Sequence, residues 1–260
     1  MMKLVKTLFA LALFGLLTAV SGGDLAQIIK QGKLRVAVTD TASAPFMTLN
    51  EKKEYQGFEL DLIKTCAQTL GVKLEIVPFN SYDELVTALT EDKADIAISQ
   101  LSRTPQRILK VDFTQPYAKL HLTLLVNRQA MLQMQKNETL DSYLRHYNGP
   151  LMVEKDSSYV AAAKTLFPST EVICFDNMGE LEKLIEKRQL IAYLSNQSTI
   201  RSLMQNHTGS YVFYQRVIME DTTDNICIAL QPNCPRLLFF LNCFLEDNAN
   251  RINSILKTAL

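Results

Sequence analysis

Strand and helix patterns alternate along the chain in two separate runs, and this alternation limits the fold more than any other feature. The first run, from Lys33, gives strand patterns at 34–39, 72–79 and 95–101 and amphipathic helix patterns at 57–71 and 81–94. The second run begins after Asn148-Gly149-Pro150, with strands expected at 150–155, 170–175 and 190–196 and helices at 157–167, 177–187 and 197–206. A β-α-β-α-β run requires parallel strands joined by right-handed crossovers. We therefore predict two similar α/β halves, followed by strands at 211–217 and 225–231 and one long helix at 235–260.

One helix start carries an unexpected charge. Thr104 followed by Pro105 predicts a hydroxyl N-cap and a proline at the first helical position, where no N–H is needed. This register puts Arg107 in the first turn, at the positive end of the helix dipole, where a cation is mildly unfavourable. A bound anion would account for the charge, and a solvated helix arginine is the alternative.

Polar side chains also gather where strands end. Small or polar residues follow four of the expected strands, at Thr39-Asp40, Gln100 to Ser102, Asp156 to Ser158 and Ser195-Asn196. In open parallel sheets, ligands bind beyond the carboxyl ends of the strands. Ser157 or Ser158 is expected to cap the next helix, whose free amides favour anions. Two α/β halves that face each other across such ends would form a cleft with an anion site.

The N-terminus has the pattern of an export signal. Two lysines in residues 1–6 precede an apolar run at 7–20, and Ala19 and Ser21 supply the small residues of a cleavage site. Because the run is shorter than the roughly 20 residues of a membrane span, we predict a cleaved signal peptide at 1–21 and an exported, periplasmic protein. A retained N-terminal anchor is the alternative.

Charge and cysteine content exclude several classes of function. The formal net charge is zero, which gives no basic surface for nucleic acid or for a membrane. The five cysteines form no CxxC pair, and the three histidines are scattered, so we expect no metal site, no cofactor and no catalytic triad. Cys227 and Cys234 either form a disulfide or remain as buried thiols.

Four segments resemble one protein family. They are LRVAVTDTASAPF at 34–46, YQGFELDL at 55–62, KADIAISQLSRTPQR at 93–107 and VDFTQPY at 111–117. Together they are similar to the extracytoplasmic solute-binding proteins of amino-acid ABC importers, in the polar amino-acid group. The likeness runs over about residues 28–258, and the segments are specific in combination but weak one by one.

The resemblance implies a bilobal α/β fold of the type II periplasmic-binding-protein class. Lobe 1 would comprise residues 24–119 and 222–260, and lobe 2 residues 120–221, with two crossovers near His121 and Asp221. A small carboxylate-bearing solute, most simply an amino acid, would close the lobes, and the closed monomer would dock on a membrane ABC permease.

The resemblance also implies roles for individual residues. The arginine matching Arg107 makes a two-pronged salt bridge to the ligand α-carboxylate, and the groups matching Ser102, Ser157 and Ser158 bind the same carboxylate. Gln100 belongs to the same strand end. For Ser102 the alternative is a turn hydroxyl.

Four further positions complete the expected site. Asp40 would lie near the ligand side chain or simply form a turn, and Tyr82 would pack on the ligand or on its own helix. Two positions depart from the family pattern, with Ser43 in place of a stacking aromatic residue and Asn196 in place of an acid that pairs with the ligand ammonium. We therefore expect the amino end of a ligand to be bound weakly.

Two other functions remain open at this point. Exported dehydratases that act on cyclohexadienyl acids share the implied fold, but catalysis would need an acid or base in the cleft, and only Asp40 and Glu154 are nearby candidates. A sensory or adhesive protein that retains the fold without transport is the other alternative. We predict a binding protein with no catalytic residues.

Overall fold

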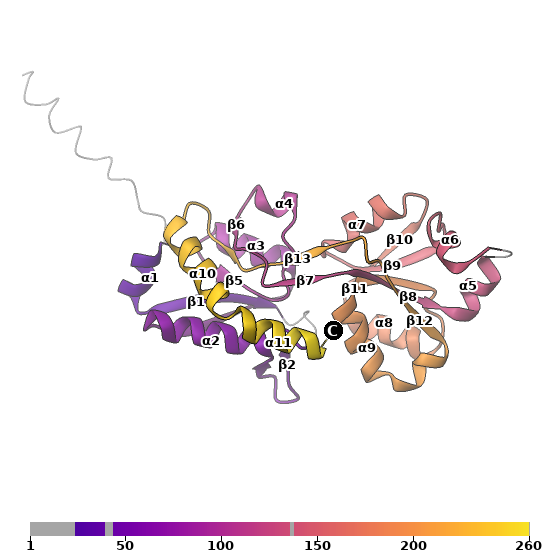
Figure 1. Cartoon of the computed structure of the whole chain (residues 1–260), viewed down its shortest axis with the longest axis horizontal. Helices are drawn as coiled ribbons and strands as arrows, with labels where there is room; N and C mark the ends of the chain where they lie inside the picture. The colour runs from indigo at the N-terminus through magenta and orange to yellow at the C-terminus, as the bar shows by residue number, and fades with distance from the viewer. Residues whose placement is uncertain (1–23, 40–43, 136–137, 260) are drawn as a thin grey trace, which may run out of the picture.

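The computed structural model describes residues 24–39, 44–135 and 138–259 and has two α/β lobes side by side (Figure 1). Each lobe is built around one five-stranded sheet, and the strands β7 and β13 run between the lobes. The predicted bilobal α/β fold is confirmed. The predicted signal peptide at 1–21 lies outside the described residues.

Lobe 1 contains the N-terminal and C-terminal parts of the chain. Its sheet has the order β4-β1-β5-β14-β6, in which β1 pairs in parallel with β4 and β5, and β14 is antiparallel to β5 and β6. The strands of this sheet are β1 (Lys33–Thr39), β4 (Lys73–Phe79), β5 (Ile96–Ala97), β6 (Asp112–Phe113) and β14 (Ala229–Leu230). A short hairpin is formed by β2 (Thr48–Leu49) and β3 (Tyr55–Gln56). The helices are α1 (Leu25–Gln31), α2 (Phe58–Leu70), α3 (Tyr82–Thr90), α4 (Pro105–Ile108), α10 (Pro235–Asp247) and α11 (Ala249–Ala259).

Helices cover both faces of the lobe 1 sheet. Successive side chains of β1 alternate between the faces, so Val36 and Val38 join the core formed with α2 and α10, whereas Ala37 joins the core formed with α3. Burial on both faces accounts for the nearly continuous apolar run of β1.

Lobe 2 repeats this arrangement, with its three parallel strands again in the order second, first, third. Its order is β10-β9-β11-β8-β12, in which β9 is parallel to β10 and β11, and β8 is antiparallel to β11 and β12. The strands are β8 (Leu122–Asn127), β9 (Pro150–Glu154), β10 (Glu171–Phe175), β11 (Ala192–Asn196) and β12 (Tyr214–Ile218). The helices are α5 (Arg128–Met134), α6 (Leu140–Leu144), α7 (Tyr159–Leu166), α8 (Met178–Glu186) and α9 (Gln197–Asn206), with a 3-10 helix at Thr208–Val212.

Two antiparallel strands connect the lobes. They are β7 (Ala118–Leu120) and β13 (Asp224–Ile226), which pair with each other between the two sheets (Figure 1). His121 follows β7, and its Nδ1 lies 2.7 Å from the carbonyl oxygen of Thr222, just before β13. The two crossing segments are therefore held together at the point where the chain passes between lobes.

The expectation of one helix at 235–260 is wrong. The helix breaks at Asn248, and α11 turns to pack along the crossing strand β7. The Asn248 side chain donates to the carbonyl oxygen of Phe244 at 2.8 Å, an example of the way asparagine competes with backbone hydrogen bonds at helix ends.

Several other boundaries differ from the expectations. Helix α3 ends at Thr90 rather than at residue 94, because Asp92 has a left-handed backbone with φ of 56°. The strand expected at 225–231 is divided between β13 and β14, and the strand expected at 211–217 begins only at Tyr214, after the 3-10 helix. The predicted helix at Thr104 exists but contains only four residues.

Candidate functional site

The short helix α4 positions Arg107 as the sequence predicts. The Thr104 hydroxyl accepts a hydrogen bond from the backbone N–H of Arg107 at 3.3 Å, and Pro105 occupies the first turn. The Arg107 guanidinium is buried and lies over the ring of Tyr82, with its carbon 5.6 Å from the ring centroid. It therefore faces into the molecule rather than into solvent, so the solvated-arginine alternative is wrong.

The hydrogen-bond acceptors of the Arg107 guanidinium among the described residues are neutral carbonyl oxygens. Its Nη1 donates to the carbonyl oxygen of Ser102 at 3.0 Å, and its Nη2 donates to the carbonyl oxygen of Asp156, in lobe 2, at 3.4 Å. Within the described part of the chain, no carboxylate oxygen lies within 4.0 Å of the guanidinium. Burial lowers the pKa of Arg107, although arginine keeps its charge in proteins. A buried cation with no ion pair favours binding of an anion.

A chain of hydroxyl groups runs from lobe 2 to Asp224. The Ser158 hydroxyl donates to Oγ of Ser102 at 2.9 Å, and the Ser102 hydroxyl donates to Oδ2 of Asp224 at 3.0 Å. Tyr159 donates to the same Oδ2 at 2.7 Å and accepts from Nδ2 of Asn196 at 2.8 Å. Burial raises the pKa of Asp224, whereas the two donated hydrogen bonds and the nearby Arg107 charge act in the opposite direction.

Asn196 caps helix α9 and contacts lobe 1. Its Oδ1 accepts from the backbone N–H groups of Ser198 at 2.9 Å and Thr199 at 3.0 Å, as an N-cap residue does. The same oxygen accepts from Nε2 of Gln100, in lobe 1, at 3.3 Å. Sequence analysis gave no indication of either role.

Glu59 accepts a hydrogen bond from the backbone of Gln100. Gln100 has a left-handed conformation with φ of 51°, and its backbone N–H donates to Oε1 of Glu59 at 2.7 Å. Glu59 is fully buried on α2 and also accepts a hydrogen bond from the hydroxyl of Tyr117. Burial raises the pKa of Glu59 to about 7. These bonds hold Gln100 in a conformation that an uncompensated residue seldom adopts.

The serine hydroxyls before α7 are not helix caps. Ser158 occupies the N-cap position, but its side chain makes no capping bond and reaches Ser102 instead. The Ser157 hydroxyl donates to the carbonyl oxygen of Glu154 at 2.6 Å. Ser158 is therefore the N-cap residue, as expected, but its hydroxyl makes no capping bond because it contacts Ser102 in lobe 1.

A small cavity lies between the lobes at this network. Its volume is about 10 Å³, which is room for about one water molecule, and it is lined by Tyr82, Gln100, Ser102, Arg107, Ser157, Ser158 and Tyr159. The structure thus brings together six of the nine predicted site residues. Asn196 hydrogen-bonds to two of the lining residues, and Asp40 and Ser43 lie outside the described residues.

Sequence analysis missed Tyr159 and Asp224. Tyr159 follows the predicted serine pair directly and could have been found from that position. Asp224 comes from β13, which lies 122 residues beyond Ser102 in the chain, and no local signal marks it.

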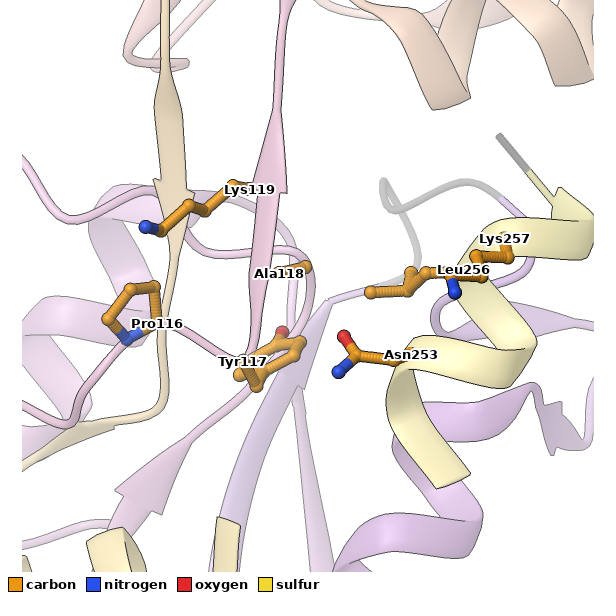
Figure 2. Close-up of a pocket in the computed structure, with 7 residues that line it drawn as sticks. All are labelled: Pro116, Tyr117, Ala118, Lys119, Asn253, Leu256 and Lys257. Carbon is orange, nitrogen blue, oxygen red and sulfur yellow. The ribbon is translucent and has the colours of Figure 1, made fainter. Parts of the chain in front are cut away.

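Two larger hollows adjoin the connection between lobes. A groove of about 610 Å³ shares Arg107, Ser157 and Ser158 with the small cavity and extends outward past Lys110 and Lys164. A separate pocket of about 460 Å³ lies between β7 and α11. Figure 2 shows its lining residues, with Tyr117, Asn253 and Leu256 around the pocket and Lys119 and Lys257 at its edge. Among the described residues, this second pocket shares no lining residue with the small cavity.

The remaining chemical expectations concern cysteine, metal and membrane. All five cysteines are free thiols, and Cys227 and Cys234 are both buried, so the disulfide alternative is wrong. The described residues contain no group of three potential metal ligands. Within the same residues, no helix is long and apolar enough to cross a bilayer.

Comparison with known proteins identifies the family. The model of the bacterial extracellular solute-binding proteins, family 3, matches residues 34–255. The chain belongs to this family. The resemblance found from the four sequence segments is thereby confirmed, and members of family 3 act outside the cytoplasm.

Individual relatives share between about a quarter and two fifths of their residues with this chain over the matched regions. A probable histidine-binding protein of Neisseria gonorrhoeae is 26% identical over 243 residues, which is 91% of this chain and 87% of that protein. The crystal structure of an ancestral amino-acid-binding protein, a precursor of cyclohexadienyl dehydratase, has a TM-score of 0.72 and 26% identity, covering 90% of this chain and 98% of that one. Membrane-bound lytic murein transglycosylase F of Yersinia pestis is 38% identical over 107 residues, which is 40% of this chain but only 21% of the enzyme.

Proposed function

We propose that this protein captures an amino acid, or a closely related small carboxylate, between its lobes and delivers it as a monomer to a membrane ABC permease. The buried Arg107, which has no ion pair among the described residues, carries this proposal. Similarity to a probable histidine-binding protein and to an ancestral amino-acid-binding protein supports it. A ligand carboxylate would give Arg107 the charged partner that the described residues do not provide.

The predicted division of the chain forms part of this proposal. Residues 24–119 and 222–260 would move as lobe 1 and residues 120–221 as lobe 2, about the crossing strands β7 and β13. Residues 1–21 would direct export to the periplasm and be removed. N-terminal sequencing of the mature protein tests this part, because a retained Met1 would contradict it.

The proposal is tested by replacing Arg107. Arg107→Ala should weaken binding of a carboxylate ligand by several decades, since loss of a desolvated charge pair costs about 2–5 kcal/mol. Arg103→Ala is a matched control, because Arg103 lies in the same turn but donates to the carbonyl oxygen of Thr114 and does not line the cavity. Calorimetry against the twenty common L-amino acids gives the readout. Equal affinity in the parent and Arg107→Ala proteins would place the ligand elsewhere.

We further propose that the protein is not an enzyme, against the specific alternative of a dehydratase. Glu154 ends β9 with a pKa that burial raises to about 7, which suits a general acid or base. However, among the described residues that line the small cavity there is no carboxyl group, and Asp224, which contacts Ser102 and Tyr159 there, accepts hydrogen bonds from both hydroxyls. Incubation with cyclohexadienyl acids, followed by ultraviolet detection of aromatic product, separates the two functions. Product that disappears in Glu154→Gln would favour the enzyme.

A further inference from the structure

Because residue 196 is a neutral asparagine, the expected site has no carboxylate at that position. An amino acid carries an α-ammonium group, which binds best to a carboxylate. Asn196 has no charge, and its Oδ1 already accepts hydrogen bonds from two α9 amides and from Gln100. This oxygen therefore has little capacity left for a ligand.

Asp224 supplies a carboxylate from a different element. It lies on the crossing strand β13, and its Oδ2 accepts from Ser102 and Tyr159, both of which line the small cavity. Its Oδ1 accepts no hydrogen bond from any residue that the structure describes. A carboxylate offers about four acceptor positions, so Asp224 retains capacity for a further donor.

Asp224 and Arg107 carry opposite charges, and both form hydrogen bonds with Ser102. The Arg107 guanidinium donates to the carbonyl oxygen of Ser102 at 3.0 Å, and the carboxylate of Asp224 accepts from the hydroxyl of Ser102 at 3.0 Å. The Arg107 charge lowers the pKa of Asp224, so the two groups are close enough to interact, although no salt bridge between them is found among the described residues. A positive and a negative pole separated in this way match the two charges of a zwitterion.

The hydroxyl protons strengthen this assignment. Ser102 and Tyr159 both direct their O–H groups to Asp224, and each oxygen already accepts one hydrogen bond, from Ser158 and from Asn196 respectively. These oxygens can therefore offer a ligand only their remaining acceptor capacity. An ammonium group is a donor only, whereas a carboxylate is an acceptor only. In this arrangement the two hydroxyls suit the amino end of a ligand, and Arg107 is left to hold its carboxylate.

We propose that Asp224 is the specificity-determining residue that holds the α-ammonium of a zwitterionic amino acid, together with the hydroxyls of Ser102 and Tyr159. This inference rests on the proposed function. It replaces the expectation that the amino end of the ligand is bound weakly, because the lost acid at position 196 is compensated from β13. The protein should consequently select amino acids over the corresponding 2-hydroxy acids.

The test compares two probes that differ only in the ammonium group. The first probe is the common L-amino acid that gives the largest thermal shift, and the second is its 2-hydroxy-acid counterpart. The parent protein should bind the amino acid at least about 10-fold more tightly, since charge-assisted hydrogen bonds are roughly twice as strong as neutral ones. Asp224→Asn should weaken amino-acid binding by about 10- to 100-fold and change hydroxy-acid binding by less than about 3-fold.

Asp221→Asn is the matched control, because Asp221 precedes β13 and lines a different hollow of the surface. It should leave both affinities unchanged. Equal affinity of the parent for the two probes would overturn the inference, and that measurement requires no variant to fold. An equal loss of both probes in Asp224→Asn, or no loss of either, would also overturn it. If neither probe binds the parent, the proposed function itself fails; if both bind through Arg107 without discrimination, only the role of Asp224 fails.

Discussion

Gln100 and Asn196 meet across the two lobes, where Nε2 of Gln100 donates to Oδ1 of Asn196 at 3.3 Å. Both side chains are buried, and neither lobe alone contains the pair. This hydrogen bond can therefore form only when the two lobes are in contact. It joins the Ser158–Ser102 bond and the bond from Arg107 to the carbonyl oxygen of Asp156 in holding them in this arrangement.

We predict that Asn196→Ala affects both a helix and the contact between lobes. Loss of the N-cap of α9 should lower the free energy of unfolding by about 1 kcal/mol. Asn177→Ala is a matched control, because Asn177 caps α8 through the N–H of Gly179 and is exposed. Both variants should lower the melting temperature, but only Asn196→Ala should also weaken ligand binding. Equal affinity in the two variants would show that residue 196 acts as a helix cap alone.

Ligand binding should change the overall dimensions of the protein. Because two strands connect the lobes, we expect a hinge that opens without ligand and closes around it, and hence a smaller radius of gyration in the bound state. Small-angle X-ray scattering with and without saturating ligand measures this change. Superimposable curves would indicate a rigid protein that does not trap its ligand.

The stability of the protein should depend on the protonation of Glu59. Its pKa rises from 4.5 to about 7 on folding, so the folded state binds more protons than the unfolded state between these values. The contribution of Glu59 to stability is therefore fully present below pH 4.5 and is lost as the pH rises towards 7. The loss is of the order of 3 kcal/mol, at 1.36 kcal/mol per pKa unit.

Glu59→Gln should flatten this part of the stability curve. Glutamine keeps an acceptor oxygen for Gln100 and Tyr117 but does not titrate. Urea unfolding at pH 5, 6, 7 and 8 gives the slope for parent and variant. Glu154→Gln serves as the comparison, because burial raises the pKa of Glu154 to about 7 as well, away from the backbone of Gln100. Parallel curves for parent and Glu59→Gln would contradict the assigned pKa.

Position 57 requires glycine for two reasons, the positive φ of its backbone and the lack of room for a Cβ atom. Its φ is 112°, and a Cβ atom built there would lie 1.5 Å from the carbonyl oxygen of Phe46. Gly57→Ala should therefore cost more than about 3 kcal/mol or prevent folding. Gly209→Ala is the control, since no heavy atom lies within 4 Å of its Cβ position, and its melting temperature should stay close to that of the parent. Similar melting temperatures for both variants would mean that the segment around Gly57 can rearrange.

The sequence by itself determined the local features of this protein. Segments with the apolar spacing of a strand alternate with segments that have the apolar spacing of a helix, and this alternation predicts the two α/β halves. Each spacing is a property of neighbouring residues. Thr104 and Pro105 likewise fix the start of α4, and this start puts Arg107 at a strand end, where it lines the cavity. These features depend on contacts within a few residues along the chain, so they can be read without the fold.

Only the tertiary structure decided which groups surround Arg107. The Ser158 hydroxyl contacts Ser102 instead of capping α7. Asp224 lies on a strand that is 122 residues beyond Ser102 in the chain. The pairing of β13 with β7 sets its position, because the antiparallel register places Asp224 opposite Leu120. Such contacts follow from how the two lobes and the crossing strands pack together, and no short segment encodes that packing. For this reason the sequence pointed to Arg107, whereas the nearby carboxylate of Asp224 became visible only in the folded chain.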